Sequence, residues 1–318
     1  MAMVSIGYFL SSEEFGPKEL VRQAKMAQDA GFERLWISDH FHPWLDDQGS
    51  SPFVWSVIGA LSEAVSLPIT TAVTCPTVRI HPAIVAQAAA TAAVQTDGRF
   101  TLGVGSGEIL NEHILGDPWP SPGQRLAMLE ESVEVIRKLF GGTEISFHGE
   151  FYEVSEARLY TLPEEQVPIY VSGFGPQATD LAARIGDGFI TVMPDAELIS
   201  RFKEASGGKT VQAGTKVCWA PTAEEGAKTA HRKWRNEALT GQLTVTLPRP
   251  KDFEAATEPI TPEAVAEQIP CGPDVDKHIQ AAREFVEAGV DELYVQQIGS
   301  DHEEFFRVWS TEVIPALR

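Results

Sequence analysis

The stretch Ile69-Thr70-Thr71-Ala72-Val73-Thr74-Cys75, with residues 82–95 and Phe100-Thr101-Leu102-Gly103-Val104 after it, decides the fold. The first and last runs are short and β-rich, which predicts two strands. Pro82 opens an alanine-rich run that continues to Gln95, and proline in a first turn is typical of a helix start. A strand, a helix and a strand in this order predict two parallel strands joined by a crossover helix.

The same alternation extends along the whole chain. Strands are predicted at 3–10, 35–38, 69–75, 100–104, 168–172, 189–192, 216–219 and 292–297. Helices are predicted at 17–30, which Gly31 follows as a C-cap signal, and at 82–95, 123–140, 177–185 and 275–288. Eight strands separated by helices in 318 residues favour a (β/α)8 TIM barrel over a doubly wound sheet.

We expect one barrel domain over residues 1–318 that carries two additions. Residues 141–163 predict a hairpin insertion that turns at His148-Gly149. Residues 241–273 are rich in proline and mixed in polarity, so they predict an irregular excursion before the helix at 275–288.

The composition excludes several classes of protein. A content of 43% hydrophobic residues supplies a full core and argues against disorder. The 25 Lys and Arg residues against 45 Asp and Glu residues give a net charge of -20, which argues against nucleic-acid or membrane binding. Three widely spaced cysteines, Cys75, Cys218 and Cys271, indicate neither a disulfide framework nor a cysteine zinc site. We expect a protein of the cytoplasm.

The predicted strand at 35–38 ends in Ser38-Asp39-His40-Phe41-His42-Pro43-Trp44. Barrels carry their catalytic groups on the loops that follow the strands. Histidine accepts protons near neutral pH, and an adjacent carboxylate can orient it, so this cluster indicates acid-base chemistry. The alternative is that Asp39 caps a turn and that the histidines are structural.

Two other strand ends carry glycine-rich loops. Gly103-Val104-Gly105-Ser106-Gly107-Glu108, with Asn111 after it, lets a flat ligand approach the backbone and places a carboxylate beside that ligand. Ser172-Gly173-Phe174-Gly175-Pro176-Gln177 leads into a helix whose free N–H groups suit a phosphate. The alternatives are a tight turn with Glu108 at a helix start and a plain helix start at 172–177. Cys75 has no evident histidine partner and is interpreted as a packing residue.

These strand ends together suit redox chemistry on a phosphate-bearing ring cofactor. A metal-dependent hydrolase is a less favoured alternative, because His40-Phe41-His42 has an H-x-H pattern but later strand ends supply no further ligands.

The chain resembles the deazaflavin-dependent branch of the luciferase-like oxidoreductases, closest to the glucose-6-phosphate dehydrogenase group that uses coenzyme F420. Three stretches carry the resemblance: 36–44, 73–77 and 102–112. It implies a barrel with insertions, a homodimer and a deazaflavin at the strand carboxyl ends. FMN, which relatives of this group use, is the alternative cofactor.

The resemblance also implies roles for single residues. His40 would remove the hydroxyl proton of an alcohol, Glu108 would act at the reduced ring, and Trp44 would position the substrate. Cofactor contacts would come from Asp39, a non-proline cis peptide at Ala72-Val73, Cys75, Glu108 and Asn111, and from the phosphate-binding segment Ser172, Gly173, Phe174, Gly175, Pro176 and Gln177.

The chain departs from this group where sugar-phosphate relatives carry cations. Val192-Met193-Pro194-Asp195 offers no lysine, and later basic positions fall near Glu254 and Glu267. A carboxylate cannot bind a phosphate dianion without a compensating cation. We therefore expect a neutral or apolar alcohol, or its carbonyl, as the substrate in place of glucose-6-phosphate.

Overall fold

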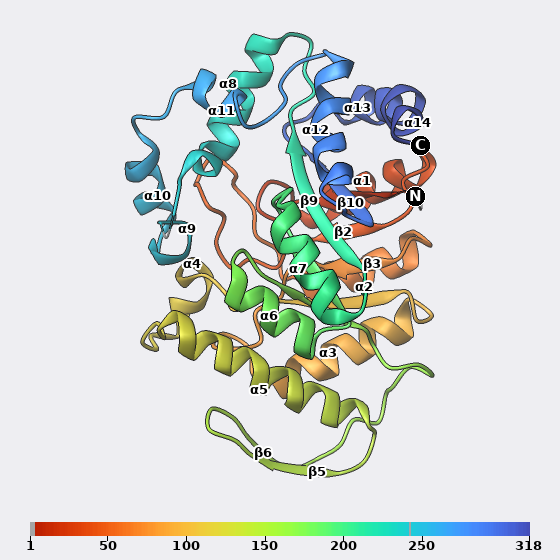
Figure 1. The fold of residues 1–318 in the computed structure, drawn as a ribbon, viewed down its shortest axis with the longest axis vertical. Helices are drawn as coiled ribbons and strands as arrows, with labels where there is room; N and C mark the ends of the chain where they lie inside the picture. The colour runs from red at the N-terminus through yellow and green to blue at the C-terminus, as the bar shows by residue number, and fades with distance from the viewer. Residues whose placement is uncertain (1–3, 242) are drawn as a thin grey trace.

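Eight parallel strands close into a barrel in a computed structural model that describes residues 4–241 and 243–318 (Figure 1). The order around the barrel is β1-β10-β9-β8-β7-β4-β3-β2. The bounds are β1 Ser5–Leu10, β2 Leu35–Ile37, β3 Ile69–Thr71, β4 Phe100–Val104, β7 Ile169–Ser172, β8 Gly188–Thr191, β9 Val211–Val217 and β10 Glu292–Gln297. The predicted (β/α)8 barrel is confirmed.

Two strands differ from their predicted bounds by more than two residues. The third ends at Thr71, four residues before Cys75, because a cis peptide bond joins Ala72 to Val73 and Thr74 pairs only through an isolated bridge. The seventh begins at Val211, before the predicted start at 216, and its inward-facing residues are polar or glycine, so no apolar run marks it. Met3, at the predicted start of the first strand, lies outside the described residues.

Helices form the outer layer of the barrel (Figure 1). Their bounds are α1 Pro17–Asp29, α2 Val54–Ala64, α3 Pro82–Gln95, α4 Ile109–Glu112, α5 Pro122–Phe140, α6 Pro176–Ile185, α7 Ala196–Ser206, α8 Ala223–Trp234, α12 Val275–Glu287, α13 His302–Val308 and α14 Ile314–Leu317. Gly31 has a φ of 81° directly after the C-cap of α1, as a left-handed C-cap position requires. No helix among the described residues is both long and apolar enough to cross a membrane.

The two additions lie apart from each other in Figure 1, the first at the bottom of the view and the second at the upper left. The first is an antiparallel hairpin of β5 Ile145–His148 and β6 Glu153–Ala157 beside α5. The second is more regular than expected, since it contains three short helices, α9 Leu243–Thr246, α10 Pro250–Thr257 and α11 Pro262–Ala266. Prolines in the first turns of α10 and α11 begin these helices instead of breaking them.

The centre of the barrel is filled by aromatic side chains. Trp36 of β2 stacks on Tyr294 of β10, with ring centroids 4.4 Å apart and an interplanar angle of 10°. Phe9 and Ile190 pack against this pair. Below the pair, Trp36 Nε1 donates a hydrogen bond to Gln212 Oε1 at 2.8 Å. Ligands can therefore enter only above this layer, at the carboxyl ends of the strands.

Candidate active site

A buried carboxylate and a histidine face each other where β1 and β2 end. Glu13 Oε2 accepts hydrogen bonds from Ser38 Oγ at 2.6 Å and from Ser11 Oγ at 3.0 Å. Its other oxygen lies 3.5 Å from His40 Nε2. Glu13 is only 3% exposed and His40 is half-buried. Glu13 was not among the site residues predicted from the sequence, although its place just after a barrel strand is a usable signal.

Asn111, in α4 after β4, holds the loop of His40 in place. Its Oδ1 accepts from the backbone N–H groups of Phe41 at 2.8 Å and His42 at 3.1 Å. These two donors fix the amide orientation, so that Nδ2 faces His40 Nδ1 at 3.1 Å and Glu108 Oε2 at 3.4 Å. The structure thus brings together three residues that the sequence analysis placed on two different strands: His40, Glu108 and Asn111.

Trp44 packs against His40, with ring centroids 5.1 Å apart. The indole of Trp44 also packs edge-on against Phe253 of α10, with ring centroids 5.2 Å apart. The proline-rich excursion therefore contributes one wall of the site. His42 is turned away, because its Nδ1 lies 2.9 Å from the carbonyl oxygen of Leu110.

Asp39 belongs to a buried ion cluster beside these residues. Its two oxygens accept from Thr74 Oγ1 at 2.8 Å and from Arg79 Nη2 at 3.0 Å. Glu112 accepts from the backbone N–H of Arg79 at 2.7 Å, and its other oxygen lies 3.5 Å from Arg79 Nε. Asp39 and Glu112 are both buried, so one arginine neutralises two desolvated carboxylates.

The pKa of Glu112 is raised to about 7, chiefly by burial, and Arg79 offsets only part of this. An acid whose pKa is higher in the folded state stabilises the fold below its unfolded pKa and loses that contribution as the pH rises through about 7. We expect the free energy of unfolding to fall between pH 5 and pH 7 by about 1 kcal/mol per pH unit from this group. Urea unfolding across this range should show a shallower fall in Glu112→Gln, and parallel curves would contradict the assignment.

The ends of β3 and β4 pack without space between them. The predicted cis peptide at Ala72-Val73 is confirmed. A Cβ on Gly105 would lie 2.7 Å from Val73 Cγ2, and one on Gly107 would lie 2.5 Å from Cys75 Sγ, so both glycines are required by this contact. Cys75 is buried and its Sγ lies 3.0 Å from Thr77 Oγ1. Burial raises the pKa of this thiol well above its usual value, as expected for a packing residue.

The segment 172–177 lies on another side of the barrel mouth, three strands from β2. A Cβ on Gly105 would lie 3.7 Å from Ser172 Cβ, so this segment adjoins the β4 loop. Gly175 is the N-cap of α6 and Pro176 begins it, with no side-chain cap on the free N–H groups. Gly173 is buried, whereas Phe174 is 54% exposed and Gln177 is exposed. An uncapped helix start of this kind can accept a phosphate.

The described residues contain no cluster of three or more metal-ligating side chains. All three cysteines are buried free thiols.

Comparison with known proteins agrees with this geometry. Residues 2–292 match the family model described as luciferase-like monooxygenase. An F420-dependent glucose-6-phosphate dehydrogenase of Microbacterium testaceum is 34% identical, over 98% of this chain and 97% of the relative. The corresponding protein of Mycolicibacterium smegmatis is 34% identical, over 100% of this chain and 99% of the relative.

A solved structure gives the same result for the fold. An F420-dependent secondary alcohol dehydrogenase in complex with an F420-acetone adduct superposes with a TM-score of 0.92 at 30% identity, over 99% of each chain. The fold is therefore shared over the whole length of this chain, and the chain belongs to the luciferase-like monooxygenase family.

Proposed function

We propose that the protein is an F420-dependent oxidoreductase that transfers a hydride between the deazaflavin and an alcohol or its carbonyl. The observation that carries this proposal is the cluster of His40, Glu13, Trp44, Asn111 and Glu108 at the barrel mouth. The similar dehydrogenases named above are F420-dependent, and one of them acts on secondary alcohols. When bound, the deazaflavin accepts the hydride or returns it.

His40 is the proposed base for the substrate hydroxyl. His40 Nδ1 lies 3.1 Å both from the carbonyl oxygen of His42 and from Asn111 Nδ2. In the tautomer that serves as base, Nδ1 donates its proton to this carbonyl, Asn111 Nδ2 donates to Glu108 alone, and Nε2 remains a proton acceptor. The Glu13 carboxylate, 3.5 Å from Nε2, then stabilises the imidazolium that forms. Trp44 covers one side of the His40 ring, which would limit the approach of water to it.

Glu108 is the proposed acid at the ring, and Asn111 positions it. Asn111 joins the two halves of the site, since one amide contacts both the His40 ring and Glu108. The Ala72-Val73 peptide, Asp39 and Cys75 complete the proposed wall behind the ring.

The site fits the deazaflavin in one further respect. The glycines at 103, 105 and 107 do not supply it, because a Cβ on each would lie 2.7 Å or less from Thr71, Val73 or Cys75, so these glycines face the end of β3. The uncapped start of α6 supplies N–H groups for a phosphate, and residues 172–177 would hold it there.

The substrate is proposed to carry no phosphate. Val192 and Met193, each 43% exposed, follow β8 at the mouth of the barrel, and Asp195 is engaged in capping α7 through its Oδ1. Glu254 and Glu267 add no positive charge. This loop therefore favours an apolar substrate body, since a dianion would need a cation here.

Two measurements test the function. When a secondary alcohol is added to purified protein mixed with F420, the visible absorbance of the oxidised deazaflavin should decrease. Micromolar glucose-6-phosphate should support no substantial turnover. A preparation that carries FMN and ignores F420 would contradict the cofactor assignment. Substantial turnover of glucose-6-phosphate would contradict the substrate class.

We also propose a cytoplasmic homodimer. Helix α3 has no charged residue, and its Ile84 and Val94 are 56% and 41% exposed, so a second copy could cover this face. Three free thiols are consistent with a reducing compartment. Sedimentation as a single chain at micromolar concentration would contradict the dimer.

A further inference from the structure

Arg125 is a buried cation without an acidic partner. It lies in the first turn of α5, is only 7% exposed, and stacks its guanidinium over Trp119 at 4.5 Å from the ring centroid. Its Nη1 donates to the carbonyl oxygen of Pro120 at 2.7 Å, while its buried Nε has no hydrogen-bond partner. A desolvated donor left unpaired costs free energy unless a ligand satisfies it.

Among the described residues, the other buried cations near the barrel mouth each form an ion pair with a carboxylate. Arg79 contacts Asp39 and Glu112, and Lys216 Nζ lies 3.1 Å from Glu237. Among the described residues, no carboxylate lies within ion-pair distance of Arg125. Burial lowers the pKa of Arg125, but an arginine remains charged at neutral pH. It is therefore a free positive charge in a chain with a net charge of -20.

Arg125 stands at the level of the proposed phosphate-binding segment. Glu130 of α5 pairs with Arg184 of α6, and these residues lie equally far from the first residues of their helices, Pro122 and Pro176. The two helices therefore begin side by side at the barrel mouth, as their adjacent first turns show in Figure 1. Packed helix axes lie about 8–10 Å apart, which is within the reach of an arginine side chain.

The side chain also points inward. Arg125 precedes Leu129 by four residues, and Leu129, Val133 and Ile136 form the buried stripe of α5 that packs on the barrel. Its position in this stripe is the one nearest the strand carboxyl ends.

We propose that Arg125 binds the anionic side chain of the deazaflavin, its phosphate or a carboxylate, together with the N–H groups at the start of α6. This inference rests on the proposed cofactor. An arginine that is already stacked on an aromatic ring loses little side-chain freedom when it pairs with an oxyanion. The site thus has a cation for its ligand despite the acidity of the whole chain.

The test compares two ligands by quenching of protein fluorescence: F420 itself, and the ribityl deazaflavin that lacks the phosphate and carboxylates. In Arg125→Gln we expect the Kd for F420 to rise about 10- to 100-fold and the Kd for the truncated ligand to change less than about 2-fold. The dependence of F420 affinity on salt should also weaken in this variant. Arg125→Lys, which keeps the charge without the planar fork, should give an intermediate loss.

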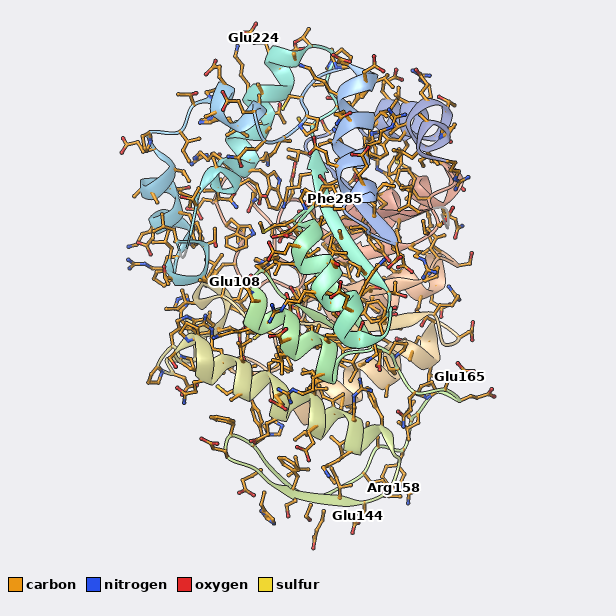
Figure 2. All side chains as sticks on the ribbon, viewed as in Figure 1. Glu108, Glu144, Arg158, Glu165, Glu224 and Phe285 are labelled. Carbon is orange, nitrogen blue, oxygen red and sulfur yellow. The ribbon has the colours of Figure 1, made fainter. Side chains whose placement is uncertain are left out.

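Arg158 provides a matched control, because its guanidinium also lies over an aromatic ring, Tyr160, at 5.1 Å. Figure 2 shows it beside the hairpin at the bottom of the view, well below Glu108. Arg158→Gln should leave both affinities unchanged. Equal losses for both ligands in Arg125→Gln, or no loss for F420, would overturn the proposal. Wild-type protein that binds the truncated ligand but not F420 would overturn it as well, and failure to bind either would overturn the cofactor assignment with it.

Discussion

Replacing His40 with alanine is expected to lower kcat for alcohol oxidation by about 10²- to 10⁴-fold, which is the usual contribution of a positioned general base. The F420 Kd should change little, because the proposed cofactor contacts lie on other residues. The measurement is single-turnover reduction of bound F420 by an alcohol, followed by absorbance. The variant should stay slow across the whole pH range in which the wild type is active.

His42→Ala is the matched control for this experiment. Its imidazole is two residues away, but it faces the carbonyl oxygen of Leu110 and not the Glu13 side of His40. It should keep activity within a few-fold of wild type. A His40→Ala enzyme that oxidises alcohols as fast as wild type would show that the base has been wrongly assigned.

Arg79→Met is expected to destabilise the fold by about 3–5 kcal/mol, because it leaves two buried carboxylates without a counter-ion. Asp39 and Glu112 are 4% and 1% exposed, so solvent cannot replace the lost guanidinium. The loss should shrink at low pH, since protonation of Glu112 removes one of the unpaired charges. Urea unfolding at pH 8 and pH 5 measures both effects.

Arg137→Met tests whether burial is the cause of this loss. Arg137 Nη2 lies 2.9 Å from Asp187 Oδ2, and the two side chains are 33% and 41% exposed, so the loss should stay below about 1 kcal/mol. Equal losses in the two variants, or a loss in Arg79→Met that grows as the pH falls, would contradict the role of the buried cluster.

The position of the candidate site followed from the sequence because strand ends converge in a barrel. Residues 38–44 and 103–111 are far apart in the chain, yet both follow strands, and Asn111 bridges their loops. Glu13 also follows a strand end, that of β1, but no aromatic or glycine pattern beside it marks it as a candidate in the sequence. Arg79 and Arg125 could not be found in this way, since their roles depend on what surrounds them in space.

The limits of the fold prediction have physical causes. Strand β9 turns Gln212 and Gly214 toward the barrel interior, where Gln212 accepts from Trp36 and a Cβ on Gly214 would lie 2.5 Å from the indole. The inward-facing positions of β9 must leave space for the indole of Trp36 and bond to it, so they carry glycine and a polar residue. The strand therefore shows no apolar run in the sequence. The proline content of residues 241–273 predicted an irregular excursion, whereas Pro250 and Pro262 each stand in the first turn of a short helix.

The Trp36–Tyr294 stack has a consequence for kinetics. Because the stack closes the barrel from beneath, the cofactor and the alcohol must enter and leave through the same opening at the carboxyl ends of the strands. Whichever of them sits deeper has to arrive first and depart last. Steady-state initial rates should therefore obey a compulsory order of addition, and the outer ligand in excess should trap the inner one in a slowly releasing complex.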